Sequence, residues 1–244
     1  MSFDFAAVVN AAPYLLQGLL FSAELTLVAM IGGMLLGTFM AIILHMGVPI
    51  AGGAVRAYVT LMRSIPLILV LFWFFFLVPL LLGHLTPAGH SIPLGPKFTA
   101  FITFTLFESA YYAEIVRAGL KAIDKGQYEG AKALGLSSLT MYWNVVVPPV
   151  LRATAPIIVS QTIILFQDTS LVYVLSLTDF LGAASKIAQR DSKLVEFYLT
   201  VAVVYLLICS IGSELSERFR KNHEHRSSNG RLERAKRAFG LARP

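Results

Sequence analysis

Long stretches without a charged side chain limit what this chain can fold into. Twenty residues lie between Glu24 and His45 without a charge, and no charge occurs from Ser64 to Pro96. A helix that crosses the hydrocarbon core of a bilayer needs about 20 mostly apolar residues. Of the 244 residues, 56% are hydrophobic and 14% are charged, whereas about a quarter of the residues of a soluble domain are charged. The sequence therefore predicts an all-α membrane protein.

Five apolar segments are predicted to cross the bilayer and to form one transmembrane domain over residues 18–216. The predicted spans are residues 22–45, 62–83, 98–120, 153–177 and 196–216. Residues 1–17 are expected to form a separate segment outside the membrane. Residues 217–244 are expected to form a basic tail on the inner side, mobile or lying on the membrane surface. In the first span, Gly33 and Gly37 have the spacing that lets a neighbouring helix pack closely.

The third and fourth predicted spans contain polar side chains, and ionised ones are costly in hydrocarbon unless they face a protein interior or a wet cavity. Arg117 lies three residues after Glu114, so these two can pair on one helix face. For Glu108 and Asp168 two interpretations stay open, namely hydrogen bonds between helices or the lining of a passage. The candidate pathway or helix-bracing residues are Arg63, Glu108, Glu114, Arg117, Gln161 and Asp168.

The distribution of Lys and Arg predicts the orientation of the chain. With the N-terminus outside, the inner segments hold two of these residues in 45–66, five in 117–152 and nine in 216–244. The outer segments hold four, which are Lys97, Lys186, Arg190 and Lys193. Cytoplasmic loops of membrane proteins carry an excess of Lys and Arg. The N-terminus is therefore predicted outside and the C-terminus inside.

The segment of residues 121–152 is predicted to contain two short helices. The first ends where Gly135 can adopt a left-handed backbone conformation. Ser137 or Ser138 can cap the second helix, which Pro148–Pro149 is predicted to stop. Such a pair of helices suits insertion into a groove on a partner protein.

A short pattern in this segment resembles the EAA loop of ABC-importer permeases. It consists of Glu129-Gly130-Ala131, then Gly135, then Val145-x-Val147-Pro148. The usual second Ala is a Gly here, and the usual Ile and Leu are both Val, with size class and polarity kept. The resemblance implies that the loop engages an ATPase, and small side chains at Gly130 and Ala131 are expected to let another backbone come close. The expected docking residues are Glu129, Gly130, Ala131, Gly135, Leu139, Val145, Val147 and Pro148.

A wider resemblance, over residues 14–216, is to the permeases of polar amino-acid ABC importers. The matching pieces besides the loop are Leu16–Leu19, Arg63–Leu67, Ala110–Gly119 and Gly126–Glu129. This resemblance implies the type I importer permease fold in a bacterial cytoplasmic (inner) membrane. It also implies three partners, which are an ATPase dimer, a second permease subunit in a heterodimer, and a periplasmic amino-acid-binding protein.

The cargo is suggested by the resemblance alone. Leu165–Phe180, with Arg190-Asp191 later, is similar to the glutamate/aspartate permeases of this family. That similarity implies an acidic amino acid as cargo. A permease for glutamine or for basic amino acids is the alternative within the family.

Other functions are excluded or left without support by missing motifs. No Gly is followed directly by Lys, which excludes the phosphate-binding loop of an ATPase. ATP and Mg²⁺ are therefore expected on the partner ATPase, and this chain is expected to bind no cofactor and to be no enzyme. The five histidines lack metal-site spacing, and no interleaved aromatic and basic residues point to nucleic acid. The alternative from another class is an ion- or proton-coupled carrier in which Glu108, Glu114 and Asp168 relay protons.

Overall fold

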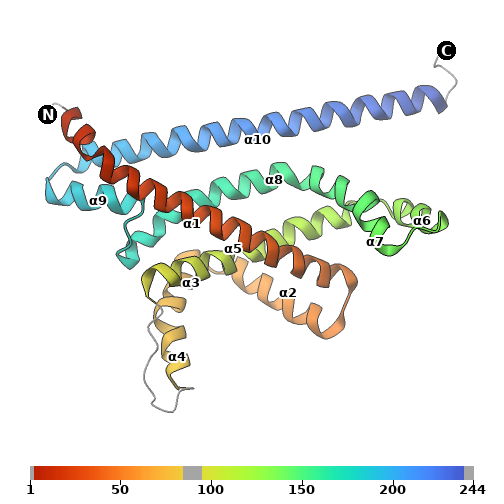
Figure 1. Cartoon of the computed structure of the whole chain (residues 1–244), viewed down its shortest axis with the longest axis horizontal. Coiled ribbons are helices and arrows are strands. Elements are labelled where there is room, and N and C mark those ends of the chain that lie inside the picture. The colour runs from red at the N-terminus through yellow and green to blue at the C-terminus, as the bar shows by residue number, and fades with distance from the viewer. Residues whose placement is uncertain (1–2, 85–94, 239–244) are drawn as a thin grey trace.

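The computed structural model of the chain describes residues 3–84 and 95–238, and its regular elements there are all helical. In chain order they are α1 (Phe5–Met46), α2 (Pro49–Ser64), α3 (Leu67–Phe72), the π-helix η1 (Trp73–Leu77), α4 (Val78–His84), α5 (Pro96–Lys121), α6 (Lys125–Ala133), α7 (Ser138–Met141), the π-helix η2 (Tyr142–Val146), α8 (Val147–Asp168), the 3₁₀ helix η3 (Thr169–Leu175), α9 (Phe180–Arg190) and α10 (Leu194–Ala238). Figure 1 shows α1, α8 and α10 running along the long axis of the molecule, and α5 contacts both α1 and α8.

The contact between α1 and α5 is close because glycines on α1 leave no side chain between the two backbones. A Cβ atom added at Gly37 would lie 2.7 Å from the carbonyl oxygen of Ser109 on α5. A Cβ atom added at Gly33 would lie 3.1 Å from the Cβ atom of Glu108. The prediction that a neighbouring helix packs against these two glycines is confirmed, and that helix is α5.

The first helix begins much earlier than the predicted span, which started near residue 22. Its N-cap is Asp4, whose carboxylate accepts a hydrogen bond from a backbone N–H of the first turn at 3.0 Å. Most of residues 1–17 thus belongs to α1 rather than to a separate segment. Contact with α9 explains the extension, since a Cβ atom added at Gly18 would lie 2.6 Å from the carbonyl oxygen of Asp179. This long-range packing leaves no trace in the hydropathy pattern.

The last helix continues into the basic tail. α10 ends at Ala238, so the described part of the tail is helical rather than irregular. Arg218 pairs with Glu214 one turn earlier, with the Nε and Oε1 atoms 3.0 Å apart. The tail is rich in Glu, Lys, Arg and Ala, which have high helix propensity. These local preferences explain why the tail is helical, and a helical tail is compatible with the predicted position on the membrane surface.

The second predicted span is divided at a proline. Ile65 has an extended backbone (φ −115°, ψ 137°), as expected for the residue before Pro66. The apolar helix therefore begins at Leu67, five residues later than the predicted span of residues 62–83. In Figure 1, α4 points away from the long axis of the molecule, and α2, which contacts α5, lies below the end of α1.

Within residues 3–84 and 95–238, four helical segments are long and apolar enough to cross a membrane. They are Phe5–Met46, Leu67–His84, Ser138–Leu175 and Leu194–Arg218. The predicted third span, which corresponds to α5, is not among them, because ionisable side chains such as Glu108 and Glu114 lower its mean hydropathy. It is instead largely covered by α1, α2 and α8.

Candidate functional site

The segment of residues 121–152, which we call the EAA-like loop, lies at the end of the bundle opposite α9 (Figure 1). Its first helix, α6, begins at Asp124, whose carboxylate accepts a hydrogen bond from the N–H of Gly126 at 2.7 Å. The helix ends at Gly135, which has φ +72°. The N–H of Leu136 donates to the carbonyl of Ala131 at 3.1 Å, which is the bond of a Schellman cap. The predicted left-handed glycine cap is confirmed.

The second helix starts as predicted but does not end as predicted. Ser137 caps α7, and its hydroxyl accepts a hydrogen bond from the N–H of Thr140 at 3.3 Å. The expectation that Pro148–Pro149 stops this helix is wrong, because η2 carries the chain into α8 without a break. The N–H of Val147 bonds to the carbonyl of Tyr142, five residues back. This wider turn places the prolines in the first turn of α8, where a missing N–H is tolerated.

The EAA-like loop exposes large apolar side chains. Leu134 is 80% exposed, Leu139 71% and Trp143 63%. The predicted docking residues Glu129 and Gly130 are exposed beside them, whereas Val145, Val147 and Pro148 are half-buried. The expectation that Ala131 lies open to a partner needs a correction. Ala131 is 4% exposed and packs into the loop, so its side chain does not face a partner. An exposed apolar surface with a polar rim is typical of a protein-binding site.

An aromatic contact that the sequence analysis missed ties the EAA-like loop to α1. The ring of Tyr128 stacks on His45, with centroids 6.2 Å apart, and meets Tyr142 edge-on at 6.4 Å. The Tyr128 hydroxyl is buried and has no hydrogen-bond partner among the described residues. Burial raises the pKa of this hydroxyl. A movement of the loop would therefore also displace the last turn of α1 through this contact.

A buried carboxylate links two helices in the bundle interior. Glu108 on α5 is 1% exposed, and the side-chain amide of Gln161 on α8 donates to its two oxygens at 3.1 and 3.3 Å. The hydrogen bond between helices, one of the two interpretations of Glu108, is thus present. Asp168 is half-buried, and no hydrogen bond of its carboxylate occurs in the described part of the chain. Its side chain remains available to a ligand or to another subunit.

A group of charged side chains lies on α2 and α5, nearer to the EAA-like loop. Arg117 and Glu114 pair as predicted, with Nε and Oε2 2.9 Å apart and a second contact from Nη2 to Oε1. The guanidinium of Arg63 lies over the ring of Tyr111, 5.6 Å from its centre. The six candidate pathway or bracing residues therefore form two groups, one in the interior around Glu108 and one at the loop side around Arg117.

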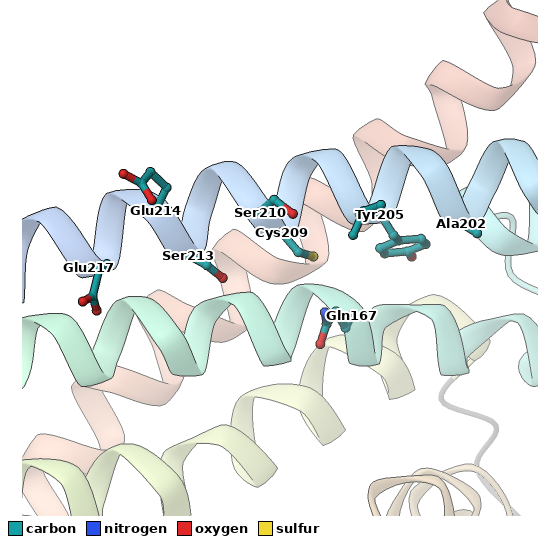
Figure 2. Close-up of a pocket in the computed structure, with 9 residues that line it drawn as sticks. Gln167, Ala202, Tyr205, Cys209, Ser210, Ser213, Glu214 and Glu217 are labelled. Carbon is teal, nitrogen blue, oxygen red and sulfur yellow. The ribbon is translucent and has the colours of Figure 1, made fainter.

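A polar groove between α8 and α10 was not predicted. It encloses about 650 Å³, and its polar lining residues are Gln167, Tyr205, Cys209, Ser210, Ser213, Glu214 and Glu217. Figure 2 shows Tyr205, Cys209, Ser213 and Glu217 along the side of α10 that faces α8. These four are spaced four residues apart, which places them on one helix face. That spacing was the signal in the sequence.

The helical bundle with its long apolar segments defines a multi-pass membrane protein that has an exposed apolar surface at one end. Residues 33–221 match the family described as "Binding-protein-dependent transport system inner membrane component". The chain belongs to this family. It is a multi-pass protein of the cytoplasmic membrane and a permease subunit of an amino-acid ABC importer.

Individual relatives support this assignment. The chain is 42% identical over 212 residues to the glutamate/aspartate import permease protein GltK of Escherichia coli O6:H1, covering 84% of this chain and 92% of that protein. It is 32% identical over 198 residues to the probable glutamine ABC transporter permease protein GlnP of Bacillus subtilis, covering 80% and 87%. A solved structure titled as an amino acid ABC transporter with histidines has a TM-score of 0.78 at 26% identity, covering 91% of this chain and 100% of that chain.

Proposed function

We propose that this permease imports glutamate and aspartate. The observation that carries the proposal is the 42% identity to a glutamate/aspartate permease, which exceeds the 32% identity to a probable glutamine permease. The glutamine relative makes glutamine the second candidate cargo. The chain itself would provide the passage and would bind no cofactor, while a partner ATPase would bind ATP and Mg²⁺.

The proposed topology has five spans, with the N-terminus outside and the C-terminus inside. α5 is the fifth span in addition to the four apolar segments. Its 26 residues give a length of about 39 Å, enough for the hydrocarbon core of about 30 Å. Its carboxylates are compatible with a membrane position because Gln161 bonds to Glu108 and Arg117 pairs with Glu114. The excess of Lys and Arg on the loop side favours this orientation.

The proposed docking site for the ATPase is the EAA-like loop, because it combines exposed apolar side chains with a fixed bend at Gly135. Glu129, Gly130 and Leu139 would contact the ATPase, and Val145 to Pro148 would join the loop to α8. ATP binding on the ATPase dimer would draw the two loops of the permease pair together. The remaining proposed partners are a second permease subunit in a heterodimer and a periplasmic amino-acid-binding protein.

Uptake competition tests the cargo. Cells with and without this chain take up labelled glutamate in the presence of unlabelled aspartate, glutamine or arginine. Uptake that depends on this chain is expected to be inhibited by aspartate and left nearly unchanged by the other two. Equal inhibition by glutamine would overturn the acidic cargo and favour the second candidate.

A second measurement separates an ATP-driven importer from a proton-coupled carrier. An uncoupler is added while the cellular ATP level is held constant, and the permease is purified in mild detergent. Uptake is expected to persist, and an ATPase is expected to co-purify in a fixed ratio. Collapse of uptake with no co-purifying ATPase would favour proton relay by Glu108, Glu114 and Asp168.

A further inference from the structure

A cavity between α1, α2 and α5 is lined by more positive than negative charge. It encloses about 300 Å³, at the small end of the range for ligand pockets. Its lining residues are Leu44, Arg56, Val59, Thr60, Arg63, Glu114 and Arg117. Three guanidinium groups and one carboxylate thus surround the same space, which we call the arginine cavity.

Two of the three arginines form no ion pair with a carboxylate among the described residues, although Arg63 lies near enough to Glu114 to interact with it electrostatically. Arg117 is occupied by Glu114, which holds its guanidinium at the wall of the cavity. Arg56 and Arg63 make no ion pair with any residue that the structure describes, and both are exposed. Unpaired cations around one small cavity attract an anion, and a guanidinium can hold a carboxylate through two parallel hydrogen bonds.

The contact of Arg63 with Tyr111 positions this guanidinium without consuming its donors. The Arg63 guanidinium carbon lies 5.6 Å from the centre of the Tyr111 ring. The Arg63 guanidinium makes no hydrogen bond with any residue that the structure describes, so this contact leaves its N–H donors unused. The edge of Arg63 therefore remains free for a planar oxyanion.

We propose that the arginine cavity binds the carboxylate groups of an acidic amino acid as it leaves the passage towards the cytosol, with Arg63 and Arg56 as its ligands. The proposal rests on the proposed acidic cargo and on the proposed orientation. It also supplies a reason why an acidic amino acid, with its net charge of −1, can pass Glu108 and Asp168, which oppose it where they are ionised. Cations on this chain, nearer to the inner side, would attract it onward.

The phosphate of an anionic lipid headgroup has similar chemistry, so the test must separate the two sources. The assembled importer, with its ATPase and permease partner, is placed in nanodiscs of neutral phosphatidylcholine without nucleotide or binding protein. Binding of labelled aspartate is then measured for the natural chain and for Arg63→Gln, Arg56→Gln and Arg63→Lys. Arg218→Gln is the matched control, because Arg218 is exposed and far along α10.

The natural chain is expected to bind aspartate, with asparagine competing poorly. Arg63→Gln is expected to weaken binding at least about tenfold, the loss of one charged hydrogen-bonded contact, and Arg56→Gln by a smaller factor. Arg63→Lys should recover part of the loss, and Arg218→Gln should change binding less than twofold. Monodisperse elution and an unchanged Tm of each variant complex exclude misfolding as the cause.

Three results would overturn the proposal. One is equal aspartate affinity in Arg63→Gln and the natural chain. Another is no detectable aspartate binding to the natural complex. The third is strong inhibition of aspartate binding when phosphatidylglycerol is added, with phosphatidylglycerol retention lost in Arg63→Gln, which would assign the cavity to lipid. If competition shows glutamine rather than glutamate uptake, the proposed function fails; if acidic uptake holds but these results appear, only the cavity assignment fails.

Discussion

The EAA-like loop and the interface between α1 and α5 are stabilised in opposite ways. The loop is shaped by local caps at Asp124, Gly135 and Ser137, and its largest apolar side chains remain exposed. In the α1–α5 interface the two backbones pack closely at Gly37, and Glu108 is buried. The loop therefore leaves an apolar surface open for a partner, as proposed, whereas the interface is formed within this chain and has no space for a Cβ atom at Gly37.

The largest effect is expected where the interface is tightest. Gly37→Ala adds a Cβ atom 2.7 Å from the Ser109 carbonyl oxygen and 2.8 Å from the Ala113 nitrogen. Both are backbone atoms, so a whole helix has to move. Overpacking of this kind typically costs about 1–3 kcal/mol. The measurement is the thermal unfolding of the purified permease in detergent, where a Tm several degrees lower is expected.

The matched control for this variant is Gly53→Ala on α2. A Cβ atom at Gly53 meets no atom within 4 Å, and Ala is favoured over Gly within a helix by about 1 kcal/mol. Its Tm should stay the same or rise. A similar fall in both variants would show that loss of glycine flexibility, rather than close packing of α1 on α5, sets the stability.

In the loop, a substitution of Gly135 is expected to act through the backbone conformation of this residue rather than through contacts with neighbouring atoms. No atom lies within 4 Å of an added Cβ atom, but φ is +72°, and a branched residue in the left-handed region costs about 1–2 kcal/mol. Gly135→Val should therefore redirect α7 and abolish most ATP-driven uptake while the Tm of the bundle changes little. Uptake of labelled glutamate and Tm are measured on the same preparation.

Gly135→Asn sharpens this prediction, because Asn tolerates the left-handed region better than other side chains. It should retain a larger part of the uptake than the Val variant. Normal uptake in Gly135→Val would contradict the view that the bend between α6 and α7 positions the ATPase.

The same contrast explains what the sequence could reveal. The caps at Gly135 and Ser137 are short-range signals, since each bond joins residues a few positions apart, and both were predictable. The predicted helix end at Pro148–Pro149 is wrong, because a π-helix that accommodates prolines has no simple sequence signature. The burial of Ala131 depends on how α6 is rotated against the rest of the protein, which its own residues do not determine.

The sequence shows which residues could form long-range contacts but not which of these contacts form. The helical spans and the Glu114–Arg117 pair follow from composition and spacing along one helix. By contrast, the bond from Gln161 to Glu108 joins residues 53 positions apart, and two polar residues in separate spans do not reveal that they meet. The same limit applies to the extension of α1, which depends on contact with α9 near Gly18.

An intermediate effect is expected at the aromatic contact between Tyr128 and His45, which joins the EAA-like loop to the last turn of α1. Tyr128→Ala removes the rings' contacts with His45 and Tyr142, each worth about 0.5–1.5 kcal/mol. ATP hydrolysis by the assembled importer should then continue, but less glutamate should be taken up per ATP, because the movement of the loop is no longer transmitted to α1 through this contact. The measurement is the ratio of glutamate transported to ATP hydrolysed in proteoliposomes.

Tyr128→Phe is the matched variant, since it keeps the ring and removes a hydroxyl that is buried without a described partner. Removal of an unsatisfied buried polar group is neutral or stabilising. The transport ratio of this variant should match that of the natural chain. An equal fall in both variants would assign the effect to the hydroxyl and not to aromatic packing.

The smallest effect is expected far from both regions, at the start of α1. Asp4 pairs with Lys193, with the Oδ2 and Nζ atoms 2.6 Å apart. The hydrogen bond from Lys193 is the main cause that lowers the pKa of Asp4 below 3.8, and the same contact raises the pKa of Lys193 above 10.5. The stabilisation from Asp4 is thus fully present above pH about 4 and is lost as the pH falls through its lowered pKa. The contribution of Lys193 is present below pH about 10.5 and is lost above its raised pKa.

Asp4→Asn separates this ion pair from the helix cap, because Asn caps a helix about as well as Asp. Hydrogen exchange of the first turn of α1 is measured as the pH is lowered from 6 to 3, after correction for intrinsic exchange rates. The natural chain should lose protection towards the acid end, and Asp4→Asn should show lower but nearly pH-independent protection. Glu214→Gln, which removes the separate pair with Arg218, should behave as the natural chain does. If Asp4→Asn kept the full pH dependence, contacts with α9 and not this ion pair would be holding the start of α1.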